Sequence, residues 1–280
     1  MKRGRLHLFI VPITIFAISL LGFAQSAGSQ RAASSPAHAL AAEAGKSTTP
    51  RGPALVNGVV QPLGNGTVRP WVKLDRDGNP TAIGVTFDEA ALDGLPAELP
   101  QGQARTEHSL PLPPQAAPFD HVMINWNPFG HEPDHIYTVQ HFDFHFYLLS
   151  EQERAGITAK GDDLIKSQRR PAAEFVPEGY VYAPHSEEPR MGAHWIDPVS
   201  HEFHGHAFTR TILWGSYDGR VIFVEPMITR AYLLTKPNVT EPLKLPARYA
   251  KPGYYPTQYS VKYDAERKEY TVAMEGMTLR

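Results

Sequence analysis

The feature that most constrains this chain is an alternating run over residues 141–147, which reads His-Phe-Asp-Phe-His-Phe-Tyr. Successive side chains of a β-strand point to opposite faces of its sheet, so the run places three phenylalanines on one face and the four polar-tipped residues on the other. The phenylalanine face predicts a buried core. Imidazole and carboxylate groups bind metals or move protons and are uncommon on a strand face that is only solvated. We therefore expect the function of the protein on the His/Asp face.

The rest of the chain also favours strands over helices. Glycine and proline are frequent, at 22 and 26 of the 280 residues, and no long helical period survives between them. The sequence predicts hairpins over residues 67–87, 208–227 and 254–273, a strand at 120–126 and a central strand at about 136–149. About eight to eleven strands with two or three short helices are expected in total. This pattern predicts a mainly β fold, either a β-sandwich or a β-barrel, with a few short helices.

One helix start is well marked. Ser150 and Glu153 have the spacing of a capping box, which predicts a short helix over residues 151–156. Because that helix begins after residue 150, the run that contains His141 and His145 is predicted to be a strand.

The first residues have the three-part layout of a secretory signal peptide. Lys2, Arg3 and Arg5 precede an apolar run over residues 8–23, and small residues follow it. We predict a signal peptide over residues 1–26 and a secreted or periplasmic protein. A single membrane anchor is the alternative, since 16 residues are near the lower limit for a span. No second apolar segment follows, so no stable membrane span is expected after cleavage.

Composition divides the remaining chain into two parts. Residues 27–53 are rich in alanine, serine, glycine and threonine without apolar periodicity, which predicts a disordered linker. Residues 54–280 are long enough for a single β-rich domain. Without the signal peptide the net charge is about −5, and no basic cluster is interleaved with aromatics, so nucleic acid is not an expected partner. The chain has no cysteine, so a metal would be held by histidine and carboxylate groups.

Strand geometry limits which residues of the central run share one ion. Alternate residues of a strand are about 6.6 Å apart, and residues i and i+4 about 13 Å apart. His141 with Asp143, or Asp143 with His145, is therefore an easier pair than the two histidines together, which meet only if both lean inward or a bulge intervenes. Asp143 has a second interpretation, as a group that orients a liganding imidazole.

Further ligands must come from other segments. His194 lies two residues after Gly192 and directly before Trp195, and its alternative role is a partly buried histidine bonded to a carbonyl. Glu225 ends an otherwise apolar strand and needs a partner there, which is a metal, a histidine or an arginine such as Arg230. His131 lies in a Gly/Pro-rich loop that either closes over the site or is solvated. The candidate metal ligands are His131, His141, Asp143, His145, His194 and Glu225.

Two other patterns point less strongly to chemistry. Residues 200–206 contain three histidines, but such a loop is more typical of an exposed turn than of a metal site. Ser216 superficially suggests a hydrolase nucleophile, yet it lacks the G-x-S-x-G motif and falls in an apparent hairpin turn.

Three stretches together also carry a family resemblance. They are residues 130–147, residues 190–197 (RMGAHWID) and residues 209–229, which contain GSYDG and EPMIT. With these motifs the chain resembles a family of exported bacterial proteins of unknown function and is similar to a sigma-factor-regulated extracytoplasmic protein of thermophiles. The resemblance covers about residues 64–234. It implies an export signal and a compact single domain, and it brings no established reaction.

These observations lead to one main functional hypothesis. We expect an exported β-rich protein with a His/carboxylate site for a divalent metal such as Zn, Fe or Mn. In an enzyme, this metal would act as a Lewis acid or activate water or oxygen. The alternative is a non-catalytic envelope protein for ligand binding or assembly, whose histidines sense pH or metal. A third interpretation is a purely structural network of buried hydrogen bonds. Whether the chain is an enzyme, which small molecule it binds and whether it forms a homo-oligomer stay open.

Overall fold

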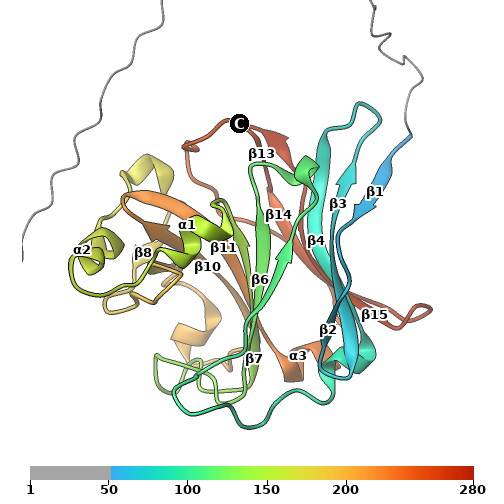
Figure 1. The fold of residues 1–280 in the computed structure, drawn as a ribbon, viewed down its shortest axis with the longest axis horizontal. Helices are drawn as coiled ribbons and strands as arrows, with labels where there is room; N and C mark the ends of the chain where they lie inside the picture. Colours follow the sequence, from blue (N-terminus) through green and yellow to red (C-terminus); the bar gives the residue numbers. More distant parts are fainter. Residues whose placement is uncertain (1–51) are drawn as a thin grey trace, which may run out of the picture. The chain divides into compact units, whose positions relative to one another are not determined.

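A computed structural model describes residues 52–280 of the chain. The predicted signal peptide and all but the last two residues of the predicted linker lie outside this part. The described residues form two large antiparallel sheets that pack face to face, with short helices and long loops on one side (Figure 1). The prediction of a mainly β protein is confirmed.

The first sheet contains seven strands. In chain order they are β1 (Ala54–Asn57), β2 (Gln61–Leu63), β3 (Gly66–Leu74), β4 (Pro80–Asp88), β12 (Asn238–Pro242), β14 (Gln258–Asp264) and β15 (Glu269–Glu275). Their spatial order is β1-β3-β4-β15-β14-β12, and β2 pairs with β3. The N-terminal and C-terminal hairpins of the domain therefore meet at the β4–β15 pair.

The second sheet also contains seven strands. They are β5 (His108–Pro111), β6 (His121–Asn127), β7 (His141–Tyr147), β8 (Val181–Tyr182), β9 (Ala193–Ile196), β10 (Arg210–Tyr217) and β11 (Arg220–Thr229). Their spatial order is β5-β6-β7-β11-β10-β9-β8, which puts β7 near the middle. A separate pair joins β13 (Tyr254–Tyr255) to β16 (Thr278–Leu279). Both large sheets are open and have edge strands, so the fold is a sandwich, and the barrel alternative is wrong.

Helices are short. They are α1 (Glu151–Ala155), α2 (Asp162–Gln168), α3 (Arg230–Leu234) and the 3-10 turns η1 (Glu89–Leu92), η2 (Pro114–Ala116), η3 (Ala173–Phe175) and η4 (His201–His204). The capping box before α1 is present, because the Ser150 hydroxyl accepts from the Glu153 amide while the Glu153 carboxylate accepts from the Ser150 amide. In the described part of the chain, no helix combines the length and apolar character needed to cross a membrane.

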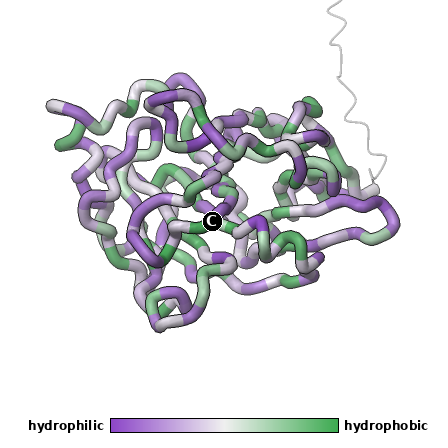
Figure 2. The backbone as a smooth tube through the Cα atoms, turned by 90° about the horizontal axis from the view of Figure 1, so that it is seen from below, coloured by the Kyte–Doolittle hydropathy of each residue, from purple (hydrophilic) through white to green (hydrophobic). Residues whose placement is uncertain are grey.

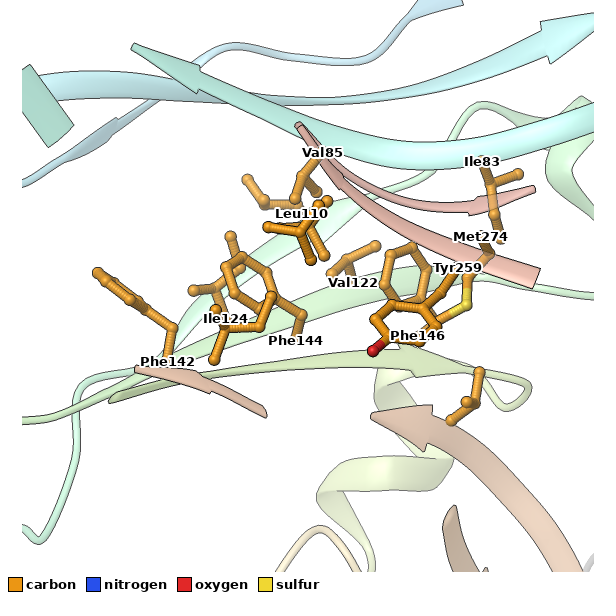
Figure 3. Packing of buried hydrophobic residues seen from close by; sticks show 14 of the residues in the cluster. Ile83, Val85, Leu110, Val122, Ile124, Phe142, Phe144, Phe146, Tyr259 and Met274 are labelled. Atoms are coloured by element: carbon orange, nitrogen blue, oxygen red, sulfur yellow. The ribbon is translucent and has the colours of Figure 1, made fainter. Parts of the chain in front are cut away.

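The phenylalanines of β7 form the centre of the sandwich core. Phe142, Phe144 and Phe146 are at most 1% exposed and point toward the first sheet. Figure 3 shows them opposite Val85 of β4 and Met274 of β15. The alternation that the sequence predicted for this strand therefore divides the second sheet into a core face and an outward face.

The predicted central strand was too long at its start. It was expected from about residue 136, but β7 begins at His141. Residues 128–140 instead fold back over the outward face, where the His131 amide donates to the Tyr137 carbonyl at 3.2 Å. Tyr137 is 2% exposed, so burial of its ring favours the loop over a longer strand.

The number of strands was also underestimated. The described residues contain sixteen strands, because short edge pairings such as β8 and β13 have only two residues each. Segments of this length carry no periodicity that a sequence can show. Figure 2 shows hydrophilic and hydrophobic residues interspersed along the backbone.

The core face yields a stability prediction. Phe144 is fully buried, so Phe144→Ala should lower the free energy of unfolding by about 3–5 kcal/mol through lost burial and a cavity. Phe129→Ala is the matched control, since that ring is 66% exposed and its loss should change stability by less than about 0.5 kcal/mol. Denaturant unfolding of both variants measures the difference, and equal destabilisation would contradict the assignment of the core face.

Candidate metal centre

The outward face of β7 is buried, although it is turned away from the first sheet. His141, Asp143 and His145 are at most 2% exposed. On β6, Asn125 lies opposite Asp143 and Met123 lies opposite His145. Figure 1 shows α1 and α2 on this outer side of the sheet. These covering segments exclude water from the outward face, so buried polar groups on it need hydrogen-bond or ionic partners.

Two small apolar clusters flank these polar groups. One contains Met123, Tyr147, Leu149, Ile157, Met191, Ile222 and Phe223. The other contains Tyr137, Phe208, Leu213 and Met227. The imidazole and carboxylate groups lie between these two apolar clusters, where electrostatic interactions are stronger than in water.

Glu225 belongs to β11, which pairs with β7 on the side opposite β6, and its side chain lies on the outward face. It lies between residues 223 and 227, which pair with Tyr147 and Asp143, so Glu225 is level with His145. Its side chain is 3% exposed, and one carboxylate oxygen is 3.2 Å from His145 Nε2. The register of two adjacent strands therefore produces this contact.

His194 reaches Glu225 from β9, across β10. Gly215 of β10 is the register partner of both His194 and Phe223. A Cβ atom at Gly215 would lie 2.1 Å from carbon atoms of the Phe223 ring. The missing side chain makes room for this ring, and His194 packs against it with 5.5 Å between ring centroids. His194 Nε2 then lies 3.8 Å from Glu225 Oε2.

His131 reaches the face from the loop over residues 128–140. Gly130 has φ of +70° and approaches Tyr137 so closely that a Cβ atom would lie 2.1 Å from its carbonyl oxygen. The His131 ring packs edge-on against His141, with 4.7 Å between centroids. Its side chain is 35% exposed, so this loop forms the part of the site that is open to solvent.

The six candidate ligands form two groups of three. The first triad consists of His131, His141 and Asp143, and the second triad consists of His145, His194 and Glu225. Within each triad, one ligand atom from every residue lies within 4.8 Å of the others. Both triads therefore have two histidines and one carboxylate.

Contacts within the first triad are close but are not hydrogen bonds. His141 Nε2 is 3.1 Å from Asp143 Oδ1, yet neither atom has a hydrogen-bond partner of acceptable geometry in the described structure. His131 Nε2 is 3.9 Å from Asp143 Oδ2. Asp143 Oδ2 also accepts from Asn127 Nδ2 at 2.8 Å, which holds the carboxylate in place.

The second triad has the same character. Although His145 Nε2 is 3.2 Å from the Glu225 carboxylate, both nitrogens of His145 and the Oε2 atom of Glu225 are buried without a hydrogen-bond partner among residues 52–280. Two donor atoms on one tetrahedral zinc lie about 3.3–3.4 Å apart, because each is about 2.0–2.1 Å from the ion. The spacing of the closest pair in each triad fits atoms that converge on a shared ion.

The protonation of three histidines is set by backbone carbonyls. The contacts are His131 Nδ1 to Glu132 O at 2.7 Å, His141 Nδ1 to Val139 O at 2.7 Å and His194 Nδ1 to Ser186 O at 2.8 Å. A carbonyl only accepts, so each Nδ1 must donate, and in a neutral imidazole Nε2 is then a bare acceptor. These acceptors face carboxylate oxygens, which also accept. Either a proton or a metal ion must then lie between the two acceptors. A histidine whose Nδ1–H donates to a carbonyl while its Nε2 faces another ligand is the outer-shell arrangement of metal-binding histidines.

Burial sets the pKa values of these groups. Burial lowers the pKa of His145 well below its usual value and also lowers the pKa of His194. Burial raises the pKa of Glu225 well above its usual value, and the Asp143 charge adds to this effect. Burial also acts to raise the pKa of Asp143, but the neighbouring imidazoles, His141 first, outweigh it and lower that pKa. Neutral imidazoles next to carboxylates favour metal binding over simple ion pairs.

The structure places His141 and His145 in different triads. Sequence reasoning named all six triad residues and treated these two histidines as the harder pair, without excluding it. It did not assign His131 to Asp143. It also missed Asn127 and Gly215, because an asparagine opposite a carboxylate and a glycine beside a bulky ring are recognised only once the strand register is known. Whether the triads bind metal stays a prediction.

The remaining sequence candidates lie outside the triads. His201, His204 and His206 are exposed, in or next to η4. Ser216 lies on β10, and its hydroxyl accepts from Trp195 Nε1 at 2.9 Å. Neither group has the geometry of a catalytic site.

Comparison with known proteins gives one match. A model of the TTHB210-like family, described as hypothetical protein TTHB210, matches residues 75–126. This segment includes β4 and β5 and lies inside the part of the chain that carries the resemblance noted from the sequence. No curated protein and no solved structure matches this chain. The match supports a relation to a family of unknown function, and export and the sigma-factor link stay predictions.

The outward face yields a pH prediction from His121. Its side chain is fully buried and stacks on Tyr147, and burial lowers its pKa despite the nearby Asp120. The folded protein therefore takes up a proton on His121 less readily than the unfolded chain, in which this histidine is protonated below about pH 6.5. This contribution to stability is present above that pH and is lost as the pH falls.

His121→Gln should make the loss of stability between pH 7 and pH 5 shallower, by at most about 1.4 kcal/mol per pH unit. Denaturant unfolding in the presence of a chelator measures the slope. His206→Gln, at an exposed position, controls for the loss of a histidine. An unchanged slope in the His121 variant would contradict the prediction.

Proposed function

We propose that this protein binds two divalent transition-metal ions, one in each triad, and uses them in a metal-dependent reaction. The observation that carries the proposal is the pairing of bare imidazole nitrogens with carboxylate oxygens in a buried face. His141 Nε2 and Asp143 Oδ1 are 3.1 Å apart without a hydrogen bond, and His145 and Glu225 repeat this arrangement at 3.2 Å. A metal ion between the atoms converts this repulsion into coordination.

The ligand set narrows the choice of metal. Two imidazoles and one carboxylate suit zinc, iron(II) or manganese, and they lack the thiolates that select softer ions. Three protein ligands leave at least one coordination position for water or substrate, as in catalytic rather than structural sites. Metal-bound water becomes acidic enough to provide hydroxide near neutral pH. This supports a hydrolytic or oxygen-activating enzyme.

The positions of the triads favour one joint centre. Asp143 and His145 are alternate residues of β7, so their Cα atoms are about 6.6–6.8 Å apart, and their side chains share one face. The charge of Asp143 also acts on Glu225 across the triads. Two ions held by neighbouring triads would share the same solvent opening beside His131.

Burial supports a second candidate function, a non-catalytic metal protein of the cell envelope. Except for His131, the ligand side chains are at most 12% exposed. Two cavities of about 160 and 240 Å³ lie elsewhere, next to Tyr249 and Glu241 respectively, and no triad residue lines either one. A site with little access would hold metal for stability or sensing. Export through the predicted signal peptide is part of both proposals and rests on the sequence alone.

Metal stoichiometry tests the proposal directly. The mature protein without a histidine tag should bind two equivalents of zinc, measured by titration calorimetry and elemental analysis. Asp143→Asn should remove one equivalent and Glu225→Gln the other, because each variant weakens a different triad, and the double variant should bind none. His201→Gln with His204→Gln is the matched control and should keep two equivalents. Failure of the wild-type protein to bind metal would overturn the proposal.

Metal should also stabilise the fold. Zinc at 100 times the dissociation constant of a site should raise the free energy of unfolding by about 2.7 kcal/mol for that site, because the unfolded chain lacks the assembled triad. The gain should disappear on addition of a chelator and should be roughly halved in Asp143→Asn. A gain of equal size in the double variant would show that zinc acts elsewhere.

A further inference from the structure

A single arginine lies at the edge of the paired centre. Arg105 belongs to the segment between η1 and β5, and its neighbour Thr106 is bonded to β6. The Thr106 amide donates to the Trp126 carbonyl at 3.0 Å, and Asn125 Nδ2 donates to the Thr106 carbonyl at 2.7 Å. Since Asn125 lies opposite Asp143, this segment runs beside the first triad.

Arg105 also lies beside the second triad. Its Nη2 atom is 3.4 Å from Glu188 Oε2. The Glu188 amide donates to the Gly192 carbonyl at 2.8 Å, two residues before His194. The guanidinium therefore lies between the segment that runs beside Asp143 and the segment that carries His194.

The guanidinium is poorly satisfied for so buried a group. Its side chain is 18% exposed, and its one ion pair in the described structure is a long contact of 3.4 Å from Nη2 to Glu188. The Nε atom is buried without a hydrogen-bond partner. A guanidinium has five donors arranged as a planar fork that matches two oxygens of an oxyanion. Arg105 therefore keeps free donors at the edge of the centre.

The balance of charge in the metal-loaded centre also favours an oxyanion as the ligand. Two divalent ions carry four positive charges, and Asp143 and Glu225 offset two of them when both are ionised. Arg105 adds a further positive charge, which the half-exposed Glu188 only partly compensates. A buried site with this excess of positive charge attracts anions strongly.

We propose that the paired centre binds a phosphoryl group, as in a small phosphate ester, with oxygens on the metal ions and a bidentate contact to Arg105. Two-metal centres clamp phosphoryl oxygens in this way, and arginine forks bind them with charge-assisted hydrogen bonds. The substrate class is thus a small organic phosphate, which would reach the centre beside His131, the most exposed of the six ligands. The inference rests on the proposed metal binding.

Phosphate binding by the zinc-loaded protein is the test. Inorganic phosphate is titrated by calorimetry into wild-type protein, Arg105→Gln and Arg76→Gln, each after its zinc content has been measured in a phosphate-free buffer. Arg76 is exposed in the β3–β4 turn and serves as the matched control. Arg105→Gln should keep two zinc ions but lose about 10- to 100-fold in phosphate affinity, whereas the control should match the wild-type protein.

A second variant keeps the inference testable if Arg105→Gln misfolds. Glu188 competes for the guanidinium and its side chain is 48% exposed, so Glu188→Gln should fold normally and bind phosphate several times more tightly. Equal phosphate affinity in the wild-type protein and a folded Arg105→Gln, or acetate binding as tight as phosphate binding, would overturn the inference while leaving metal binding intact. If the wild-type protein binds no zinc, the proposed function fails and the phosphoryl site fails with it.

Discussion

Burial of three imidazoles and two carboxylates on one face of a sheet is the constraint on which the rest of this structure depends. Such groups are costly away from water unless each finds a partner, and backbone carbonyls already occupy the Nδ1 atoms of three histidines. The Nε2 atoms of these histidines face carboxyl groups, so each contact needs a proton or a metal ion between the two groups. A metal ion in each triad, as proposed, would also explain why His145 Nε2 and a Glu225 oxygen lie 3.2 Å apart without a hydrogen bond to that nitrogen.

The two faces of the second sheet have different roles. One face packs in the sandwich core and stabilises the fold, and the other carries the candidate metal ligands. Phe142, Phe144 and Phe146 anchor β7 in the sandwich core, so the backbone of the strand is fixed independently of any ligand. A rigid strand holds Asp143 and His145 in register with β6 and β11, and pre-organised ligands bind a metal without a large ordering cost. The loop over residues 128–140 supplies the one solvent-exposed candidate ligand, because His131 has the greatest contact with solvent among the six.

The lack of cysteine gives the proposed site its chemical character. Nitrogen and oxygen ligands favour zinc, iron(II) or manganese and leave coordination positions open for an anion or water. Arg105 fits this proposal, since a poorly satisfied guanidinium beside two bound cations would favour the entry of a negatively charged molecule. The proposed site would combine a metal centre in the interior with an anion-binding edge, and both depend on the loops that cover the outward face.

The sequence by itself determined that the chain is mainly β, that residues 141–147 form a strand with one phenylalanine face and one His/Asp face, and that Glu225 needs a partner. These properties follow from local alternation and from the cost of a buried charge. Only the tertiary structure decided how the ligands group, because His131 joins Asp143 through a folded-back loop, and His194 joins Glu225 across Gly215. Pairings between distant strands depend on register and side-chain volume, and no local pattern in the sequence contains that information.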